Sequence, residues 1–269
     1  MSSSNPSKCA LCADHWLDAA RPRRYLLADM VRRAAPARYA RPEIPAFFRT
    51  LEQKLGPQHW WPARTPFEVI VGAILTQNTS WQNVARAIKN LRRAGRLSLR
   101  ALERTPRRRV AALIRSSGYF NQKAARLKHF VRSVVDEYGG SLQRMFREPT
   151  ARLRARLLEL NGIGAETADS ILLYAGNHPS FVVDAYTRRI LARHGLISEK
   201  ASYAQVQSLF ENNLPRSVRI YNEYHAQLVE VGKRYCLRRK AHCGNCPLGP
   251  YLTKEQRWQL QREFGPGPS

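Results

Sequence analysis

The sequence predicts an all-α fold, and three observations support this prediction. No stretch of the chain alternates apolar and polar residues with the period of a β-strand. Residues that favour helix N-termini recur at short intervals ahead of apolar segments. A Gly-Ile-Gly break, Gly162 to Gly164, separates two of the predicted helices and is typical of a tight turn between them.

From about Pro45 the chain is predicted to form helices with short breaks. The clearest helix start is Thr65-Pro66-Phe67-Glu68, because Thr65 can cap the helix, proline suits the first position and Glu68 can close a capping box. The apolar residues as far as Leu75 indicate a buried helix, which breaks at residues 76–79. The next helices are expected to begin at four capping residues, Ser80, Ser98, Thr105 and Asn121, the last helix ending at Gly139-Gly140. Later helices are expected over residues 150–160, 165–175, 184–194, 203–213 and 217–235, followed by cysteines and a basic tail.

Charge is the strongest signal in the composition. The 269 residues include 45 Lys and Arg against 20 Asp and Glu, a formal net charge of +25. This charge favours a polyanionic partner, and nucleic acid is the first expectation, with an anionic membrane surface as the alternative. No apolar run reaches the roughly 18 residues of a membrane span, and no signal peptide is evident. We therefore expect a cytoplasmic protein, in which five cysteines are better explained as metal ligands or free thiols than as disulfides.

Residues 1–40 differ from the rest of the chain. They contain Arg-rich patches, a Cys-x-x-Cys pair at Cys9 and Cys12, and a short amphipathic stretch around Trp16–Ala34. A second methionine, Met30, lies close to the predicted globular part. The extension is therefore expected to be either a poorly ordered arm or the result of a misplaced start site.

The segment from Leu160 to Ala168 is the most informative stretch. Its two glycines allow a positive φ and a close approach of the backbone to another molecule. The free N–H groups at the start of the following helix form a phosphate site. An ordinary helix–helix turn is the alternative, but the net charge favours DNA binding. The residues expected to contact DNA are Gly162, Ile163, Gly164, Ala165, Thr167 and, further along, Arg188.

Asp184 follows the apolar run Phe181-Val182-Val183 and begins a helix. Its ordinary role would be that of an N-cap. Alternatively it is a catalytic carboxylate, because a helix N-terminus keeps it ionised and able to stabilise a cationic sugar or activate water.

Together these segments resemble the helix-hairpin-helix DNA glycosylase superfamily, typified by endonuclease III, over about residues 45–250. In that family the hairpin reads LPGVGxKTA, and a catalytic aspartate follows in a Val-Asp pair, where this chain has Asp184. Gln77 matches the family glutamine that enters the duplex beside the flipped base.

The resemblance implies a two-lobed helix-hairpin-helix glycosylase fold with a C-terminal cysteine loop. The lobes would comprise residues 67–180, with six helices, and residues 41–66 plus 181–269, with the active site between them. It also implies a monomer that extrudes a damaged base from double-stranded DNA.

One departure from the family concerns the mechanism. Bifunctional members have lysine where this chain has Glu166, and the lysine amine attacks C1′ to form a Schiff base. Glutamate cannot do so, and the resemblance therefore implies a monofunctional hydrolase in which Glu166 and Asp184 are the candidate catalytic carboxylates. The alternatives are a bifunctional lyase with another amine and a non-catalytic DNA-binding module.

The 3-methyladenine glycosylase III branch is the more similar one. The shared segments are Trp60-Trp61-Pro62, residues 72–79, residues 117–124 and residues 162–169. In that branch an aromatic residue at the place of Trp81 and the Trp-Trp-Pro segment form the base pocket. Aromatic faces suit an electron-poor or cationic alkylated purine, although core packing is the alternative for each tryptophan.

The last predicted feature is a cysteine loop. Cys236, Cys243 and Cys246 keep the first three spacings of the C-x6-C-x2-C-x5-C pattern by which endonuclease III relatives bind a [4Fe–4S] cluster. Leu252 stands in the fourth place. Three possibilities follow: Cys9 or Cys12 completes a cluster, the loop holds a cluster with a non-cysteine or open site (or, with less support, a zinc ion), or no metal is bound.

Overall fold

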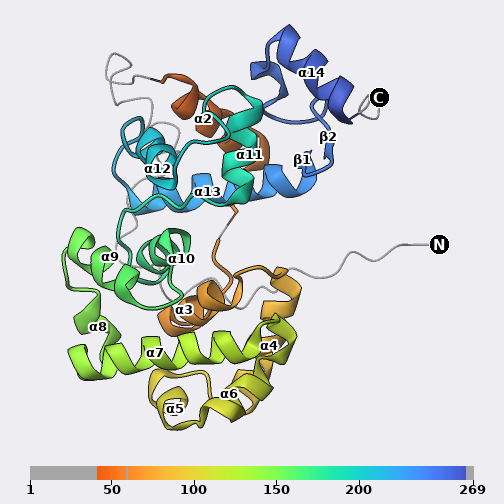
Figure 1. Cartoon of the computed structure of the whole chain (residues 1–269). Helices are drawn as coiled ribbons and strands as arrows, with labels where there is room; N and C mark the ends of the chain where they lie inside the picture. Colours follow the sequence, from red (N-terminus) through yellow and green to blue (C-terminus); the bar gives the residue numbers. More distant parts are fainter. Residues whose placement is uncertain (1–40, 59, 265–269) are drawn as a thin grey trace.

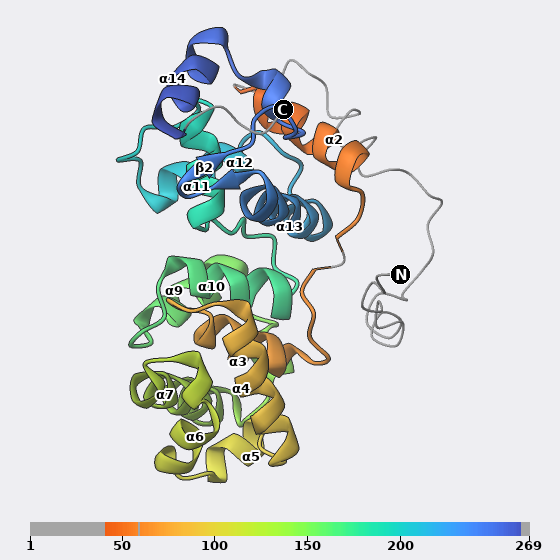
Figure 2. The same cartoon turned by 90° about the vertical axis from the view of Figure 1, so that its right-hand side faces the viewer.

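The computed structural model describes residues 41–58 and 60–264. The predicted extension at 1–40, with Cys9, Cys12 and the amphipathic stretch, lies outside the described residues. Figures 1 and 2 show two groups of helices, one above the other, joined by the segment after α2 (Glu43–Leu55) and by the segment that leads into α11 (Ala185–Arg193). None of the helices in the described ranges has the length and apolar character that crossing a bilayer requires.

The lower group in Figure 1 contains α3 to α10. These helices are α3 (Pro66–Leu75), α4 (Trp81–Arg93), α5 (Leu99–Arg104), α6 (Arg107–Leu113), α7 (Phe120–Tyr138), α8 (Leu142–Met145), α9 (Thr150–Glu159) and α10 (Ala165–Ser170). One hydrophobic core holds them together, and α3 lies at its centre with Ile70, Ile74 and Leu75 fully buried. The cap at Thr65 forms as expected, because its side chain accepts the N–H of Glu68.

The upper group consists of α2 and the C-terminal elements. The latter are α11, α12 (Tyr203–Glu211), α13 (Val218–Arg234) and α14 (Lys254–Phe264). A second core joins α2, α11, α12 and α13, with Phe181 and Phe210 stacked at a centroid distance of 3.9 Å. The helices α11 and α13 pack closely because Gly232 has no side chain: a Cβ there would stand 2.4 Å from the ring of Tyr186.

A buried polar network connects the two groups. Asp169 of α10 is fully buried and accepts two hydrogen bonds from Arg154 of α9, at 2.8 and 3.0 Å. It also accepts hydrogen bonds from Ser180 at 2.7 Å and from Gln207 of α12 at 3.0 Å. Since a buried carboxylate must be paired and hydrogen-bonded, this network holds α12 against α10.

The all-α class is confirmed, but several local predictions were wrong. The helix α7 begins at Phe120 after Tyr119 in a left-handed conformation, so Asn121 lies inside the helix rather than at its cap. Thr105 donates its hydroxyl back to Ala101 instead of capping α6. The helix predicted over 165–175 ends as α-helix at Ser170 and continues as a π-helical turn, Ile171–Ala175.

The C-terminal region also departs from the prediction. The expected basic tail contains α14. The cysteine loop begins with a short antiparallel pair, β1 (Cys236–Leu237) and β2 (Lys240–Ala241), in which Cys236 pairs with Ala241. Two-residue strands are too short to leave an alternating pattern in the sequence.

Candidate active site and cysteine loop

The hairpin between α9 and α10 has the backbone that its glycines predict. Gly162 has φ +84°, and a Cβ there would stand 2.3 Å from Nε of Arg126, whose side chain covers the turn. Ile163 is buried and anchors the hairpin in the first core. At Gly164 no other atom lies within 4 Å of the position of a Cβ, and no side chain caps α10. This end of the hairpin is therefore open to an approaching anion.

Gln77 contacts the hairpin rather than pointing freely outward. Its amide donates to the carbonyl oxygen of Gly162 at 2.9 Å and to the hydroxyl of Thr167 at 3.0 Å, and Arg126 donates to its amide oxygen. The buried ammonium of Lys123 donates to the backbone carbonyl of Leu75 at 2.9 Å. This bond fixes the C-terminal end of α3, which lies just before Gln77 in the chain. Gln77 would have to break these bonds to enter a duplex.

Asp184 lies at the start of α11, where the upper group of helices meets the lower one. One carboxylate oxygen, Oδ1, accepts the N–H of Thr187 at 2.7 Å and caps the helix. The other, Oδ2, lies 3.7 Å from Nε2 of His225. Asp184 thus caps the helix with Oδ1, while Oδ2 takes no part in the cap.

His225 and Tyr174 are site residues that the sequence analysis missed. His225 of α13 is buried, its Nδ1 lies 2.5 Å from the hydroxyl of Tyr174, and its Nε2 has no hydrogen-bond partner among the described residues. Burial lowers the pKa of His225, although the charge of Asp184 acts in the opposite direction. Burial thus favours the neutral imidazole of His225 next to the carboxylate of Asp184. No spacing in the sequence connects α13 to Asp184, so only the fold could identify this residue.

Glu166, in the first turn of α10, is the second acidic group at this junction. Its side chain keeps contact with solvent, but the surrounding protein disfavours its charged form. This desolvation, together with the negative charge of Asp184, raises the pKa of Glu166 to about 7. Near pH 7 Glu166 is therefore about half protonated.

The three predicted pocket tryptophans gather into one cluster. The ring centroids of Trp61 and Trp81 are 5.4 Å apart, and those of Trp60 and Trp61 are 5.7 Å apart. Trp61 also packs on Tyr174, at 5.2 Å, which places this cluster next to the partner of His225. Pro62 is exposed. Trp60 and Trp61 each have a buried indole N–H without a hydrogen-bond partner among the described residues.

Two basic residues have positions that their sequence context did not indicate. Lys233 of α13 places its ammonium 5.1 Å from the ring centroid of Trp60, so an amine stands beside the aromatic cluster. Arg188, expected at a phosphate, instead donates to the carbonyl oxygen of Ala201 at 2.5 Å and thereby fixes the loop before α12.

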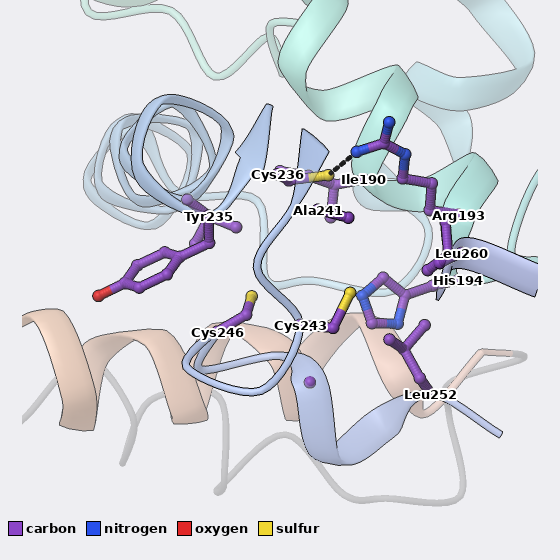
Figure 3. Close-up of a pocket in the computed structure, with 12 residues that line it drawn as sticks. Ile190, Arg193, His194, Tyr235, Cys236, Ala241, Cys243, Cys246, Leu252 and Leu260 are labelled. Atoms are coloured by element: carbon purple, nitrogen blue, oxygen red, sulfur yellow. Dashed lines mark hydrogen bonds between the residues drawn. The ribbon is translucent and has the colours of Figure 1, made fainter. Parts of the chain in front are cut away.

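The cysteine loop encloses a separate cavity between α11, α13 and α14 (Figure 3). Cys236, Cys243 and Cys246 all line it, and Leu252 fills the fourth place with an apolar side chain. The atom-free space measures about 320 Å³, part of it open to solvent. Gly249 closes the loop tightly, because a Cβ there would stand 2.1 Å from the carbonyl oxygen of Cys243.

The donors around this cavity fit a thiolate-bound group. Arg193 donates a hydrogen bond to Sγ of Cys236 at 3.2 Å. Burial raises the pKa of Cys246 to about 11, so a metal would have to displace its proton. Among the described residues no three Cys, His, Asp or Glu side chains converge on a point where a single ion would be held. A cluster, which binds each thiolate at a different iron, does not need that convergence.

Comparison with known proteins identifies the family. The model of the HhH-GPD superfamily of base excision DNA repair proteins matches residues 71–216, a span that includes the hairpin and Asp184. A Methanocaldococcus jannaschii protein named "Putative DNA repair glycosylase MJ1434" is 49% identical over 209 residues, which are 77% of this chain and 94% of that protein. Endonuclease III of Thermotoga maritima is 28% identical and covers 68% of this chain and 80% of its own length.

Solved structures agree with these relatives. The structure of H. pylori 3-methyladenine DNA glycosylase (MagIII) bound to 1,N6-ethenoadenine has a TM-score of 0.62 and 29% identity, over 71% of this chain and 96% of that chain. A trapped endonuclease III–DNA covalent intermediate superimposes with a TM-score of 0.70 at 22% identity, over 81% of this chain and 97% of that chain, a likeness that concerns the fold alone. The chain belongs to the HhH-GPD superfamily and is a base excision DNA repair glycosylase.

Proposed function

We propose that this glycosylase is monofunctional and releases alkylated or otherwise electron-poor purines from double-stranded DNA. The observation that carries the proposal is the placement of Glu166 and Asp184 together at the start of α10 and α11, with no hairpin lysine. A carboxylate can stabilise a cationic sugar and accept a proton from water, but it cannot form a Schiff base.

In the proposed reaction the extruded base lies against the cluster of Trp60, Trp61 and Trp81. The C1′–N bond breaks, its electron pair leaves with the base, and positive charge develops on the sugar. Asp184 faces this charge with Oδ2, the oxygen not used as a helix cap. Water then adds to C1′ and gives a proton to Asp184, which releases it to solvent. A cationic N-methylated base leaves as a neutral molecule and needs no acid catalyst, whereas neutral 1,N6-ethenoadenine leaves as an anion and takes up a proton from water.

The aromatic cluster supports the substrate class. An electron-poor purine binds well to the faces of indole rings such as those gathered here. The related MagIII structure holds 1,N6-ethenoadenine, an etheno-bridged purine. We therefore expect 1,N6-ethenoadenine and N-methylated purines to be released faster than oxidised pyrimidines.

A panel of duplexes, each with one lesion, tests this proposal. The duplexes carry 1,N6-ethenoadenine, 7-methylguanine, thymine glycol or no lesion, and alkali reveals the abasic sites that are formed. We expect strand breaks only after alkali, and on the two purine lesions. Trp81→Ala should slow release of these purines, whereas Gln82→Ala, the exposed neighbour at the same helix start, should not. Release of thymine glycol alone would contradict the purine assignment.

A second candidate, a bifunctional glycosylase and abasic-site lyase, rests on Lys233. Its amine lies beside Trp60 and is the observation that favours a lyase in the absence of a hairpin lysine. Borohydride trapping on abasic DNA separates the two candidates, since only an amine that forms a Schiff base becomes linked to DNA. Trapping that disappears in Lys233→Met would establish the second candidate.

We further propose that the cysteine loop holds a [4Fe–4S] cluster through Cys236, Cys243 and Cys246, with zinc as the less favoured occupant. Such a group would fasten the loop to α11 and present Arg238, Arg239 and Lys240 to phosphates. It takes no part in the proposed chemistry at Asp184.

A further inference from the structure

The cavity of the cysteine loop has three thiols and lacks the fourth. Leu252 stands where the related pattern has its last cysteine, and its buried side chain lines the cavity without a donor atom. A cluster of the [4Fe–4S] type has four irons, and each normally takes one protein ligand. The fourth donor would therefore have to come from another residue around the same cavity.

Only a few of the lining side chains carry polar atoms. The guanidinium of Arg193 has only N–H donors, which it gives to Cys236 and to the carbonyl oxygen of Leu237, so it is not a ligand. The ring of Tyr235 points away from the thiols in Figure 3. Besides the cysteines, the one described lining residue that remains as a donor is His194.

His194 is well placed for this role. It is the C-cap residue of α11, and Figure 3 shows its ring next to the thiol of Cys243 and close to Leu252. Its ring packs edge-on against Phe47 at a centroid distance of 4.9 Å, which restricts its orientation. Its Nδ1 is buried and has no hydrogen-bond partner in the described chain. In Figure 3 this nitrogen lies on the side of Leu252, whereas the other ring nitrogen, Nε2, lies toward the thiol of Cys243.

We propose that Nε2 of His194 is the fourth protein ligand, so that the loop holds its cluster with three cysteines and one histidine. This inference rests on the proposed cluster but not on the proposed base specificity. Imidazole nitrogen is an established iron ligand in protein iron–sulfur centres and an established partner of cysteine in zinc sites. The replacement substitutes a neutral donor for a thiolate, so the cluster carries one negative charge fewer.

The test compares four forms of the full-length chain, purified without oxygen. They are the parent, His194→Ala, His242→Ala, and the double variant His194→Ala with Leu252→Cys. His242 is the matched control, because it adjoins Cys243 in the sequence but does not line the cavity. The double variant restores a cysteine in the fourth place of the pattern. Iron and sulfide per chain, visible absorption and thermal unfolding are measured on each form.

We expect the parent and His242→Ala to hold the same amount of iron. His194→Ala should bind the cluster at least about tenfold more weakly, and the double variant should recover it. In the reduced parent, pulsed electron paramagnetic resonance should detect a directly coupled nitrogen that is absent from the double variant. The double variant should also have a lower reduction potential, since four thiolates add negative charge.

Three results would overturn the inference. The first is a parent that binds no iron, which removes the cluster itself without affecting the base-release assay. The second is full iron content in His194→Ala together with no coupled nitrogen in the parent. The third is loss of iron in a Cys9→Ser, Cys12→Ser double variant with His194 intact, which would assign the fourth ligand to the N-terminal segment. Recovery of iron by Leu252→Cys excludes simple misfolding as the cause of a loss in His194→Ala.

Discussion

Replacing Asp184 by asparagine separates its two roles. The change removes the negative charge but keeps an Oδ1 atom that can accept the N–H of Thr187, which is now bound at 2.7 Å. Because asparagine and aspartate are equally good N-caps, only the charge–dipole interaction is lost, about 0.3–1 kcal/mol of folding stability. Relief of the repulsion between Asp184 and Glu166 partly offsets this loss.

The effect on base release should be far larger. A positioned base typically contributes about 10²- to 10⁴-fold, equivalent to roughly 3–5 kcal/mol of activation free energy. Asp184→Ala should lose a similar amount of activity and, in addition, about 1 kcal/mol of stability, because it removes the cap itself. The asparagine variant is thus expected to be folded and inactive, and the alanine variant inactive and less stable.

The assay is single-turnover release of 1,N6-ethenoadenine, with enzyme in excess and alkali to cut the product. Urea unfolding gives the stability of each variant, and fluorescence anisotropy gives its affinity for the uncleaved duplex. Affinity should stay close to that of the parent, since neither change removes a positive charge. A rate constant for Asp184→Asn within roughly tenfold of the parent would refute the assignment of Asp184 as the base.

Three further predictions concern Glu166 and Asp169. Borohydride should trap no parent enzyme on lesion-containing duplex, whereas Glu166→Lys should give a weak covalent complex because an amine then occupies the hairpin position; strong trapping of the parent would contradict the monofunctional mechanism. The pKa of Glu166 is raised to about 7. The proton on Glu166 therefore stabilises the folded state fully at pH values below the ordinary pKa of glutamate, and this contribution disappears as the pH rises through about 7. The stability of Glu166→Gln relative to the parent, measured by urea unfolding, should therefore increase between pH 5 and 8, and an unchanged difference would argue against the raised pKa. Asp169→Asn should lower the free energy of unfolding by about 3 kcal/mol. This is the lower end of the cost of breaking a buried ion pair, because the side chain of Arg154 is 29% exposed. A loss below about 1 kcal/mol would show that the network does not join the lobes.

The candidate site residues show how much could be predicted from the sequence. Asp184 could be identified because its environment is local: an apolar run before it and a helix after it place the carboxylate at a helix N-terminus. The hairpin could be identified for the same reason, since a positive φ at Gly162 depends only on the residue itself. His225 and Tyr174 could not, because they come from α13 and from the π-helical turn after α10, and nothing local relates them to Asp184.

By itself, then, the sequence determined the helical class, most helix starts, the hairpin and the affinity for a polyanion, because these depend on caps, glycines and net charge that act over a few residues or over the whole chain. Only the tertiary structure decided which side chains meet. In the folded chain Gln77 is hydrogen-bonded to Gly162, Arg188 is hydrogen-bonded to the loop before α12, and the ammonium of Lys233 lies against the ring of Trp60. It also placed His194 at the cavity where Leu252 leaves the fourth position without a donor. Packing of helices from distant parts of the chain creates these contacts, and no local pattern in the sequence records the register of one helix against another.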